Sequence, residues 1–423
     1  MNVFALTSLL VSLTALCAYL NTRFLKLPVT VGVVIVGLLL AVVTSALAGL
    51  GVAPAREAVS MLAGVRFNDV LFQGVLSFLL FAGALGLNTD VLLKQRGAVL
   101  TFALVSTALS ILLVGALVYL LLDVAGLHIS PLLALLFGAI ISPTDPVAVL
   151  DLLKRARVPA RLESLIAGES LFNDGVGVVA FTILAALAFG SSHHEVTGVL
   201  DVLRLFLQEA VGGAFFGWLL GLAAWWLLRQ VDDYLTEVLL TLAVVTGGNL
   251  LASWLGVSGP LAMVVAGLLI GRVRERGIVS DASRPHFDAF WHLTEEVLNV
   301  GLFVLIALEA VVVNFSLKGL LLGLACVVIV LAARAISVRL PMVVLRRHYE
   351  FTPFTSQVMT WGGLRGGIAV ALAFSMPPGN TQTLFLVLTY VVVVFSIVVQ
   401  GLSMGRLVAK VNESAEALKV REA

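Results

Sequence analysis

Charged residues are scarce in this sequence: they make up only 12% of its 423 residues, about half of the share in an ordinary soluble domain. Hydrophobic residues supply 60%, which leaves too few polar side chains to cover a water-soluble surface. The net charge of +1 provides no basic field that would attract nucleic acid. The two cysteines, Cys17 and Cys326, lie far apart in apolar runs, so neither a disulfide framework nor a cysteine metal site is expected. The composition indicates a protein embedded in a lipid bilayer, without a nucleic-acid partner and with nothing that points to a cofactor.

Long apolar runs recur along the chain and are separated by short loops that carry turn residues or charges. A helix needs about 20 apolar residues to cross ~30 Å of hydrocarbon. We therefore expect an all-α polytopic membrane protein with thirteen transmembrane helices, of which the ninth is short. These spans lie near residues 3–20, 28–48, 69–87, 97–122, 131–151, 163–189, 203–228, 235–254, 258–271, 291–313, 317–343, 353–375 and 381–407.

The 26 lysines and arginines are distributed unevenly between the loops. When the spans are threaded alternately, most of these residues fall on one side, and cytoplasmic loops are the ones that carry such an excess. This asymmetry predicts a multi-pass protein of the cell (plasma or inner) membrane, with its N-terminus outside and its C-terminus in the cytoplasm. Residues 1–409 form the expected transmembrane domain, and residues 410–423 form a short cytoplasmic tail.

The fifth span contains the first polar interruption, the run 142–146 with the sequence Ser-Pro-Thr-Asp-Pro. Pro143 and Pro146 remove two backbone donors and clash with preceding carbonyls, so the helix should break here. Broken backbone is tolerated at membrane depth only where it is buried in protein or lines a cavity. The carbonyls freed beside Asp145 would be suitable ligands for a cation. The alternative is a simple proline kink in which Asp145 caps the second half of the helix.

The sixth span contains the second interruption, the run 168–175. Ser170 and Asp174 are four residues apart and share a helix face, and Glu169 and Asn173 form another such pair. An ionisable residue at the bilayer centre costs roughly 2.5 to 3.5 kcal/mol, and such residues usually line a pathway or pair with one another. In the alternative reading, these four side chains merely bond neighbouring helices.

The twelfth span contains the third interruption, a glycine-rich run around Arg365 that includes Gly363 and Gly366. Such a run weakens a helix. The span lies seven after the fifth and therefore crosses in the opposite direction. Inverted repeats place interrupted helices in corresponding positions, and spans two to six and nine to thirteen each have the break fourth. A phosphate-binding loop is not supported, because no strand or Lys-Ser/Thr ending accompanies the glycines.

Arg334 in the eleventh span needs a counter-ion if it is buried. Glu169 is the natural candidate, because two charges that are each costly alone can neutralise one another. The alternative is that Arg334 extends to the inner membrane surface.

These segments, in this order, resemble those of the sodium/proton exchangers, the electroneutral cation/proton antiporters of the NhaP and NHE type. The resemblance covers nearly the whole chain and implies a homodimer in which a mobile core moves against a dimerisation part. The core would comprise about spans four to six and eleven to thirteen, with the fifth and twelfth spans crossing in it. The segments that carry the resemblance are residues 142–146, 168–175, 334–338 with Pro341, and 362–366.

The resemblance also implies roles for individual residues. Asp174, Ser170 and the Thr144 region would ligate the transported Na+, and Glu169 and Arg334 would form a structural ion pair beside Asn173. One departure from the family stands out: many relatives have Leu-Phe-Glu-Gly in the third span, whereas this chain has Ala82 in place of the glutamate. Coordination, affinity or ion preference would be affected by that change.

These roles predict a secondary active transporter, not an enzyme, that contributes to pH homeostasis. H+ and Na+ would compete for Asp174, and Asp145 would support the site electrostatically. If Arg334 neutralises Glu169 and Asn173 is uncharged, only one carboxylate changes state, so the exchange should be one for one.

Three alternatives remain open at this point. The first is an antiporter that prefers K+, or one that accepts Li+. The second is a passive cation channel, since freed carbonyls also suit conduction. The third is an intramembrane aspartyl protease that uses Asp145 and Asp174, although the expected glycines precede neither aspartate.

Overall fold

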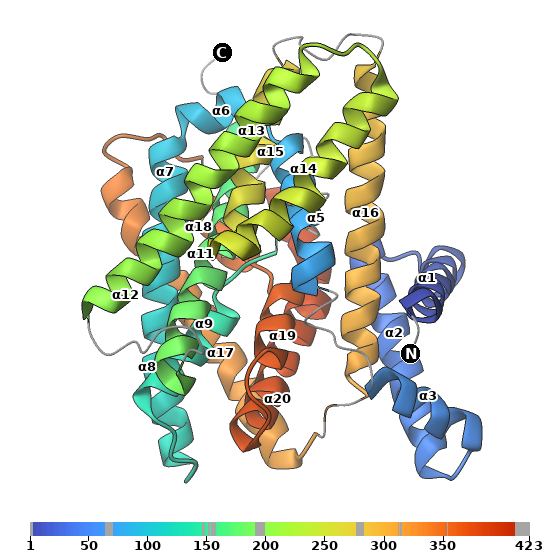
Figure 1. Cartoon of the computed structure of the whole chain (residues 1–423). Coiled ribbons are helices and arrows are strands. Elements are labelled where there is room, and N and C mark those ends of the chain that lie inside the picture. Colours follow the sequence, from blue (N-terminus) through green and yellow to red (C-terminus); the bar gives the residue numbers. More distant parts are fainter. Residues whose placement is uncertain are drawn as a thin grey trace.

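The structure is a computed structural model that describes residues 3–63, 71–145, 149–150, 153, 158–190, 199–275, 283–311, 313, 315–352 and 354–410. Every regular element within these residues is a helix (Figure 1), which confirms the all-helical class. Pro146, predicted to interrupt the fifth span, lies outside the described residues, as does the tail beyond Lys410.

The helices occupy the apolar runs of the sequence, and most are several turns long. The longer ones are α1 (Val3–Leu20), α2 (Val29–Gly49), α3 (Ala53–Ala63), α5 (Leu76–Gly86), α8 (Thr107–Val124), α9 (Pro131–Ile141), α11 (Ala160–Phe189), α13 (Gly213–Leu228), α14 (Tyr234–Leu255), α15 (Gly259–Glu275), α16 (Arg284–Glu309), α17 (Leu317–Leu345) and α20 (Asn380–Phe395). The short helices are α6 (Thr89–Lys94), α7 (Arg96–Thr101), α12 (Val199–Phe206), α18 (Thr355–Trp361) and α19 (Gly367–Phe374). Wider π-helical turns extend several of them: Asn21–Leu25, Leu71–Val75, Phe102–Ser106, Leu207–Gly212 and Ser396–Gln400.

Nine helical segments in this part of the chain are long and apolar enough to cross a bilayer, which supports a multi-pass membrane protein. The count of thirteen crossings and the inverted-repeat relation remain predictions. The nine segments are Thr7–Leu25, Val29–Gly49, Arg96–Val124, Ala160–Phe189, Leu200–Leu228, Tyr234–Leu255, Arg284–Glu309, Leu317–Leu345 and Asn380–Lys410, with Leu76–Gly86 and Pro131–Ile141 as shorter apolar helices.

Local sequence signals fix several helix ends. The Ser130 hydroxyl accepts a hydrogen bond from the Leu133 N–H at 3.2 Å, and Pro131 follows at the first helical position, so α9 begins there. Helix α14 begins at the Asp233 cap and ends at Gly256, whose φ of 64° lies in the left-handed region. Satisfied termini of this kind are needed where water is absent.

Helix α16 runs the height of the molecule beside α2 and α1 (Figure 1). A Cβ atom on Gly37 of α2 would lie 2.6 Å from the Cβ of Ala307, so the glycine permits this close packing of α2 on α16. Another side of α16 packs against α5 and α19. This helix therefore lies between the N-terminal helices and the segments that carry the polar interruptions.

Two helices are broken where the sequence predicts it. Helix α9 ends at Ile141, directly before the proline-containing segment, and the run 362–366 separates α18 from α19. The two breaks meet: the Asp145 N–H donates to the Leu364 carbonyl at 2.8 Å as an isolated antiparallel bridge. Segments more than 200 residues apart in sequence thus share a backbone hydrogen bond in the interior.

Candidate functional site

The backbone of the first break is satisfied by an arginine from the second. Nη1 of Arg365 donates to the Ser142 carbonyl at 2.5 Å and to the Pro143 carbonyl at 3.0 Å. Arg365 is 1% exposed, so these bonds form away from water, where an unpaired carbonyl is costly. We expected freed carbonyls to be ligands for a cation, but these two already accept from a guanidinium. An arginine guanidinium is a charged donor, and it forms stronger hydrogen bonds to carbonyls than a neutral donor does.

The backbone of the second break is held by side chains of the last helix. The Arg365 N–H donates to the Ser396 hydroxyl at 2.9 Å, and that hydroxyl donates to the Gln400 Oε1 at 2.6 Å. Nε2 of Gln400 in turn donates to the Trp361 carbonyl at 2.8 Å. The broken segment is therefore fixed by polar partners, as membrane depth requires.

The glycines of the second break permit two close approaches. A Cβ on Gly363 would lie 2.7 Å from the Arg334 Nε, and one on Gly366 would lie 2.7 Å from the Asp145 Cβ. Real Cβ atoms do not come this close to such atoms. Gly363 and Gly366 thus make room for Arg334 and for the carboxylate of the first break.

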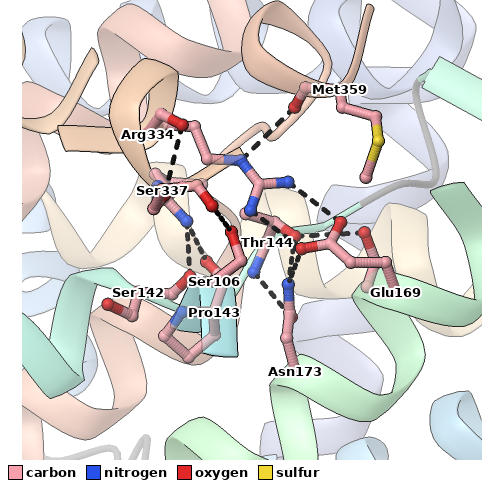
Figure 2. Close-up of polar contacts among 11 residues, drawn as sticks. Ser106, Ser142, Pro143, Thr144, Glu169, Asn173, Arg334, Ser337 and Met359 are labelled. Carbon is pink, nitrogen blue, oxygen red and sulfur yellow. Dashed lines mark hydrogen bonds and ion pairs between the residues drawn. The ribbon is translucent and has the colours of Figure 1, made fainter. Parts of the chain in front are cut away.

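Glu169 and Arg334 contact one another through both oxygens of the carboxylate (Figure 2). The Nη1 to Oε1 distance is 2.8 Å and the Nη2 to Oε2 distance is 2.9 Å, while Nε donates to the Met359 carbonyl at 3.3 Å. The two side chains are 1% and 3% exposed. A bidentate pair with additional hydrogen bonds is the arrangement in which buried charges are tolerated.

The Asn173 amide links this pair to the first break (Figure 2). Its Nδ2 donates to Glu169 Oε1 at 2.9 Å and to the Thr144 Oγ1 at 2.7 Å, and its Oδ1 accepts from the Thr144 N–H at 3.2 Å. The Thr144 and Ser170 hydroxyls lie 3.0 Å apart. Both oxygens are therefore already engaged in a buried network that holds α11 against the break.

Asp174 differs from Glu169, the other carboxylate of this part of α11, because one of its oxygens is not bonded. The side chain is 7% exposed, and Oδ1 has no hydrogen-bond partner within the described part of the chain. Asp174 lies on the wall of a cavity of about 330 Å³, together with Pro143, Asp145 and Gly366 from the two breaks. Thr144 and Ser170 belong to the network behind this wall and do not line the cavity. The structure thus places the two aspartates at the cavity, and the ion pair with Asn173 one layer deeper.

Further polar residues on the cavity wall escaped the sequence analysis. They are Glu163 and Ser164 of α11, Asn88, and Glu295 and Asn299 of α16. For Glu295 and Asn299, the sequence signal was their four-residue spacing, which puts both side chains on one helix face.

Glu295 also bears on the departure in the third span. Ala82 is buried in an apolar cluster with Phe81 and Trp291 and does not line the cavity. The adjacent Gly83 does, and a Cβ atom there would lie 3.9 Å from the Glu295 Oε1. A carboxylate therefore reaches this part of the cavity from α16 and not from α5.

Comparison with known proteins gives concordant results. The family model described as "Sodium/hydrogen exchanger, transmembrane" matches residues 11–410. The chain is 41% identical over 412 residues to the Na(+)/H(+) antiporter NhaP of Pseudomonas aeruginosa, covering 96% of each chain. It is 32% identical to the Na(+)/H(+) antiporter NhaH of Halobacillus dabanensis, covering 92% of this chain and 93% of that one. Its fold is similar to that of the sodium proton antiporter MjNhaP1 from Methanocaldococcus jannaschii, with a TM-score of 0.73, 20% identity and coverage of 97% and 98%.

Proposed function

The chain belongs to the sodium/hydrogen exchanger family, and from this premise we propose that it exchanges Na+ for H+ across the cell membrane with Asp174 as the shared binding group. It is a multi-pass transporter and not an enzyme, which removes the aspartyl protease reading. The observation that carries the assignment of Asp174 is its unbonded oxygen on the wall of a cavity that the two helix breaks also line.

The charges around Asp174 support a single exchangeable site. Glu169 is neutralised by Arg334 at 2.8 Å, and Asn173 carries no charge. The charged groups that act on Asp174 are Asp145, Glu169 and Arg365. In this proposal Asp145 supports the site electrostatically, and Asp174 alone changes between a protonated and a cation-bound form. One Na+ then replaces one H+, and no net charge moves.

Coupling follows from the energetic penalty on an unpaired carboxylate. Asp174 carries no net charge when it binds either ion, and a core that carries it can then move past apolar residues. The empty, ionised form would have to cross the same barrier as a bare charge, which costs several kcal/mol. Coupling of Na+ to H+ transport therefore needs no second binding site, since only the forms of the protein in which Asp174 has bound one of the two ions cross the barrier.

Ser170 and Thr144 complete the proposed Na+ site when the core rearranges. Ser170 shares a face of α11 with Asp174, and its hydroxyl lies 3.0 Å from that of Thr144, so a rearrangement of this network would bring either oxygen to the cation. Oxygen ligands suit a hard cation such as Na+. The choice among Na+, Li+ and K+ would follow from the radius of this ligand set, and Na+ is the ion named for the relatives.

The wider architecture of the proposal follows the family. Thirteen crossings would place the N-terminus outside and the C-terminus in the cytoplasm, with spans two to six and nine to thirteen as inverted repeats. The core of about spans four to six and eleven to thirteen would move against a dimerisation part within a homodimer. Residues 1–409 would form this membrane domain, and residues 410–423 would form the cytoplasmic tail.

The decisive experiment is proton flux in everted membrane vesicles from cells that express the protein. Addition of Na+ should release protons from wild-type vesicles, and Asp174→Asn should abolish the release. Asp232→Asn is the matched control, because Asp232 is exposed and lies outside the cavity. Undiminished Na+-driven release in Asp174→Asn would refute the assignment.

Two further experiments test the remaining alternatives, an antiporter with another ion preference and a passive cation channel. Titration with Na+, Li+ and K+ in turn ranks the ions and tests for a K+ antiporter. Reconstituted protein under voltage clamp should give no steady Na+-driven current, because one-for-one exchange moves no charge. A sustained current would point to a channel or to a different stoichiometry.

A further inference from the structure

One face of the C-terminal half of α16 carries two carboxylates, Glu295 near the middle of the helix and Glu309 at its end. At 100° per residue, Glu295, Asn299, Leu302, Ile306 and Glu309 fall within roughly 40° on either side of a common line along the helix. The polar members lie at the ends of this stripe, and the apolar members lie in the middle. This half of the helix thus has an acidic residue at each end of one face, with an apolar barrier between them.

The first end of the stripe is open to the cavity. Glu295, Asn299 and Leu302 line the same space as Asp174. Leu302 also packs closely against α19, because a Cβ on Gly367 would lie 2.7 Å from a Leu302 methyl carbon. Ile306 and Glu309 do not line the cavity.

The second end of the stripe is sealed. Glu309 is 3% exposed, and its Oε1 has no hydrogen-bond partner among the residues that the structure describes. It is the last residue of α16, where the negative end of the helix dipole makes a carboxylate unfavourable. Tyr390 of α20 packs over this end, and its hydroxyl donates to the Ile306 carbonyl at 3.2 Å. Within the part of the chain that the structure describes, no hydrogen bond to Oε1 accounts for an acid at this position.

We propose that Glu309 is a second cation-binding group, which receives Na+ from the outer side when the core moves to its other position. This inference rests on the proposed exchange function. The elements that touch the barrier, α19 at Leu302 and α20 at Ile306, belong to the proposed mobile core. Movement of these elements along α16 covers Glu295 and uncovers Glu309. Each side of the membrane then has its own carboxylate on α16, and both serve Asp174.

The test compares two vesicle orientations loaded with a pH-sensitive dye. In the proposed topology the loop after the third span, where Asn88 lines the cavity, is cytoplasmic, and the end of the tenth span, which carries Glu309, is on the outer side. Na+ added to everted vesicles therefore reaches the cavity side, and Na+ added to right-side-out vesicles reaches the side of Glu309. Glu309→Gln should raise the half-saturating Na+ concentration roughly ten- to hundredfold in right-side-out vesicles, the range expected for loss of one charged ligand. In everted vesicles it should stay within about twofold of wild type. Glu295→Gln should show the opposite pattern, and the exposed Glu296→Gln should match wild type in both.

The outcomes separate this inference from the function on which it rests. An equal shift on both sides, or no shift on either, for Glu309→Gln would overturn the outer site while Na+-driven flux in the wild type continues. Absence of flux in wild-type vesicles of both orientations would overturn the exchange function itself.

A labelling experiment keeps the test valid if Glu309→Gln inserts poorly. The thiol of a Glu309→Cys variant should react with a membrane-impermeant maleimide from the outer side, and faster when the ion gradients favour the outward-open form. The native Cys17 and Cys326 are fully buried and give little background. A thiol that stays unreactive from the outer side under all gradients would overturn the proposal.

Discussion

The buried pair of Glu169 and Arg334 allows the structural role of a charge to be separated from a transport role. We consider two single variants, Glu169→Gln and Arg334→Met, and their combination. Gln retains an oxygen that can accept from the Asn173 Nδ2, which bonds Glu169 Oε1 at 2.9 Å. Met fills most of the space of the Arg334 side chain without a charge.

Each single variant leaves one charge buried without its partner. Loss of one member of a buried pair costs about 3–5 kcal/mol, whereas replacement of both members is often close to neutral. The double variant still loses the bond from Arg334 Nε to the Met359 carbonyl, worth about 1 kcal/mol. At an unfolding entropy of roughly 2.1 cal/mol/K per residue, the single variants of this 423-residue chain should melt about 3–6 °C lower, and the double variant about 1 °C lower.

The assay is thermal unfolding of purified protein in one detergent, followed by Na+-driven proton flux at a temperature where all variants are folded. If the pair is structural, the double variant should be more stable than either single variant and should regain exchange. Additive losses in melting temperature would refute the energetic reasoning. A double variant that is stable but inactive would show that one of the two charges takes part in the transport cycle.

Two further predictions concern the helix break and a helix cap. Gly177→Ala should slow exchange about tenfold, because its Cβ would lie 2.5 Å from the Pro143 Cγ and displace the first break. Gly247→Ala is the control: its Cβ would lie in open space, so this variant should transport as wild type does. Dye-monitored proton flux compares the two variants, and normal transport by Gly177→Ala would contradict the need for this contact. The Thr236 hydroxyl and N–H both donate to the Asp233 carboxylate and lower its pKa. The cap on α14 is therefore intact at any pH above the usual aspartate pKa of about 3.9, and it is lost as the pH falls through the lowered pKa of Asp233 in the folded protein. Hydrogen exchange at Thr236, corrected for intrinsic rates, should therefore accelerate in acid in the wild type but not in Asp233→Asn, and equal acid dependence would contradict the cap.

Those features that the sequence predicted well are the ones with a strong local cause. Pro143 cannot donate a backbone hydrogen bond and its ring clashes with the preceding turn, so a break at this position could be expected from the sequence. The glycines around Arg365 located the second break in the same way. The contact of Glu169 with Arg334 required only the rule that a buried charge seeks an opposite one. None of these inferences depended on how distant helices pack.

The features that the sequence did not reveal depend on packing between distant segments. Arg365 was expected to mark a weak helix, yet its guanidinium bonds the carbonyls of Ser142 and Pro143, more than 200 residues earlier in the chain. Nothing in the local pattern assigns those carbonyls a donor. The supporting bonds of Ser396 and Gln400 were missed for the same reason, since both residues lie inside an apolar run that reads as an ordinary span.

The cavity wall on α16 illustrates how a departure from a family pattern can be offset elsewhere. Ala82 removes a glutamate that many relatives have in the third span, and sequence reasoning could only register the loss. In the folded chain, Glu295 from α16 approaches the adjacent Gly83, whose missing side chain leaves room for it. The carboxylate then belongs to a helix that packs against α2 outside the proposed core, and not to α5. Under the proposed mechanism, an acid on α16 stays in place while Asp174 moves, so it can attract a cation on one side of the membrane without travelling as an uncompensated charge.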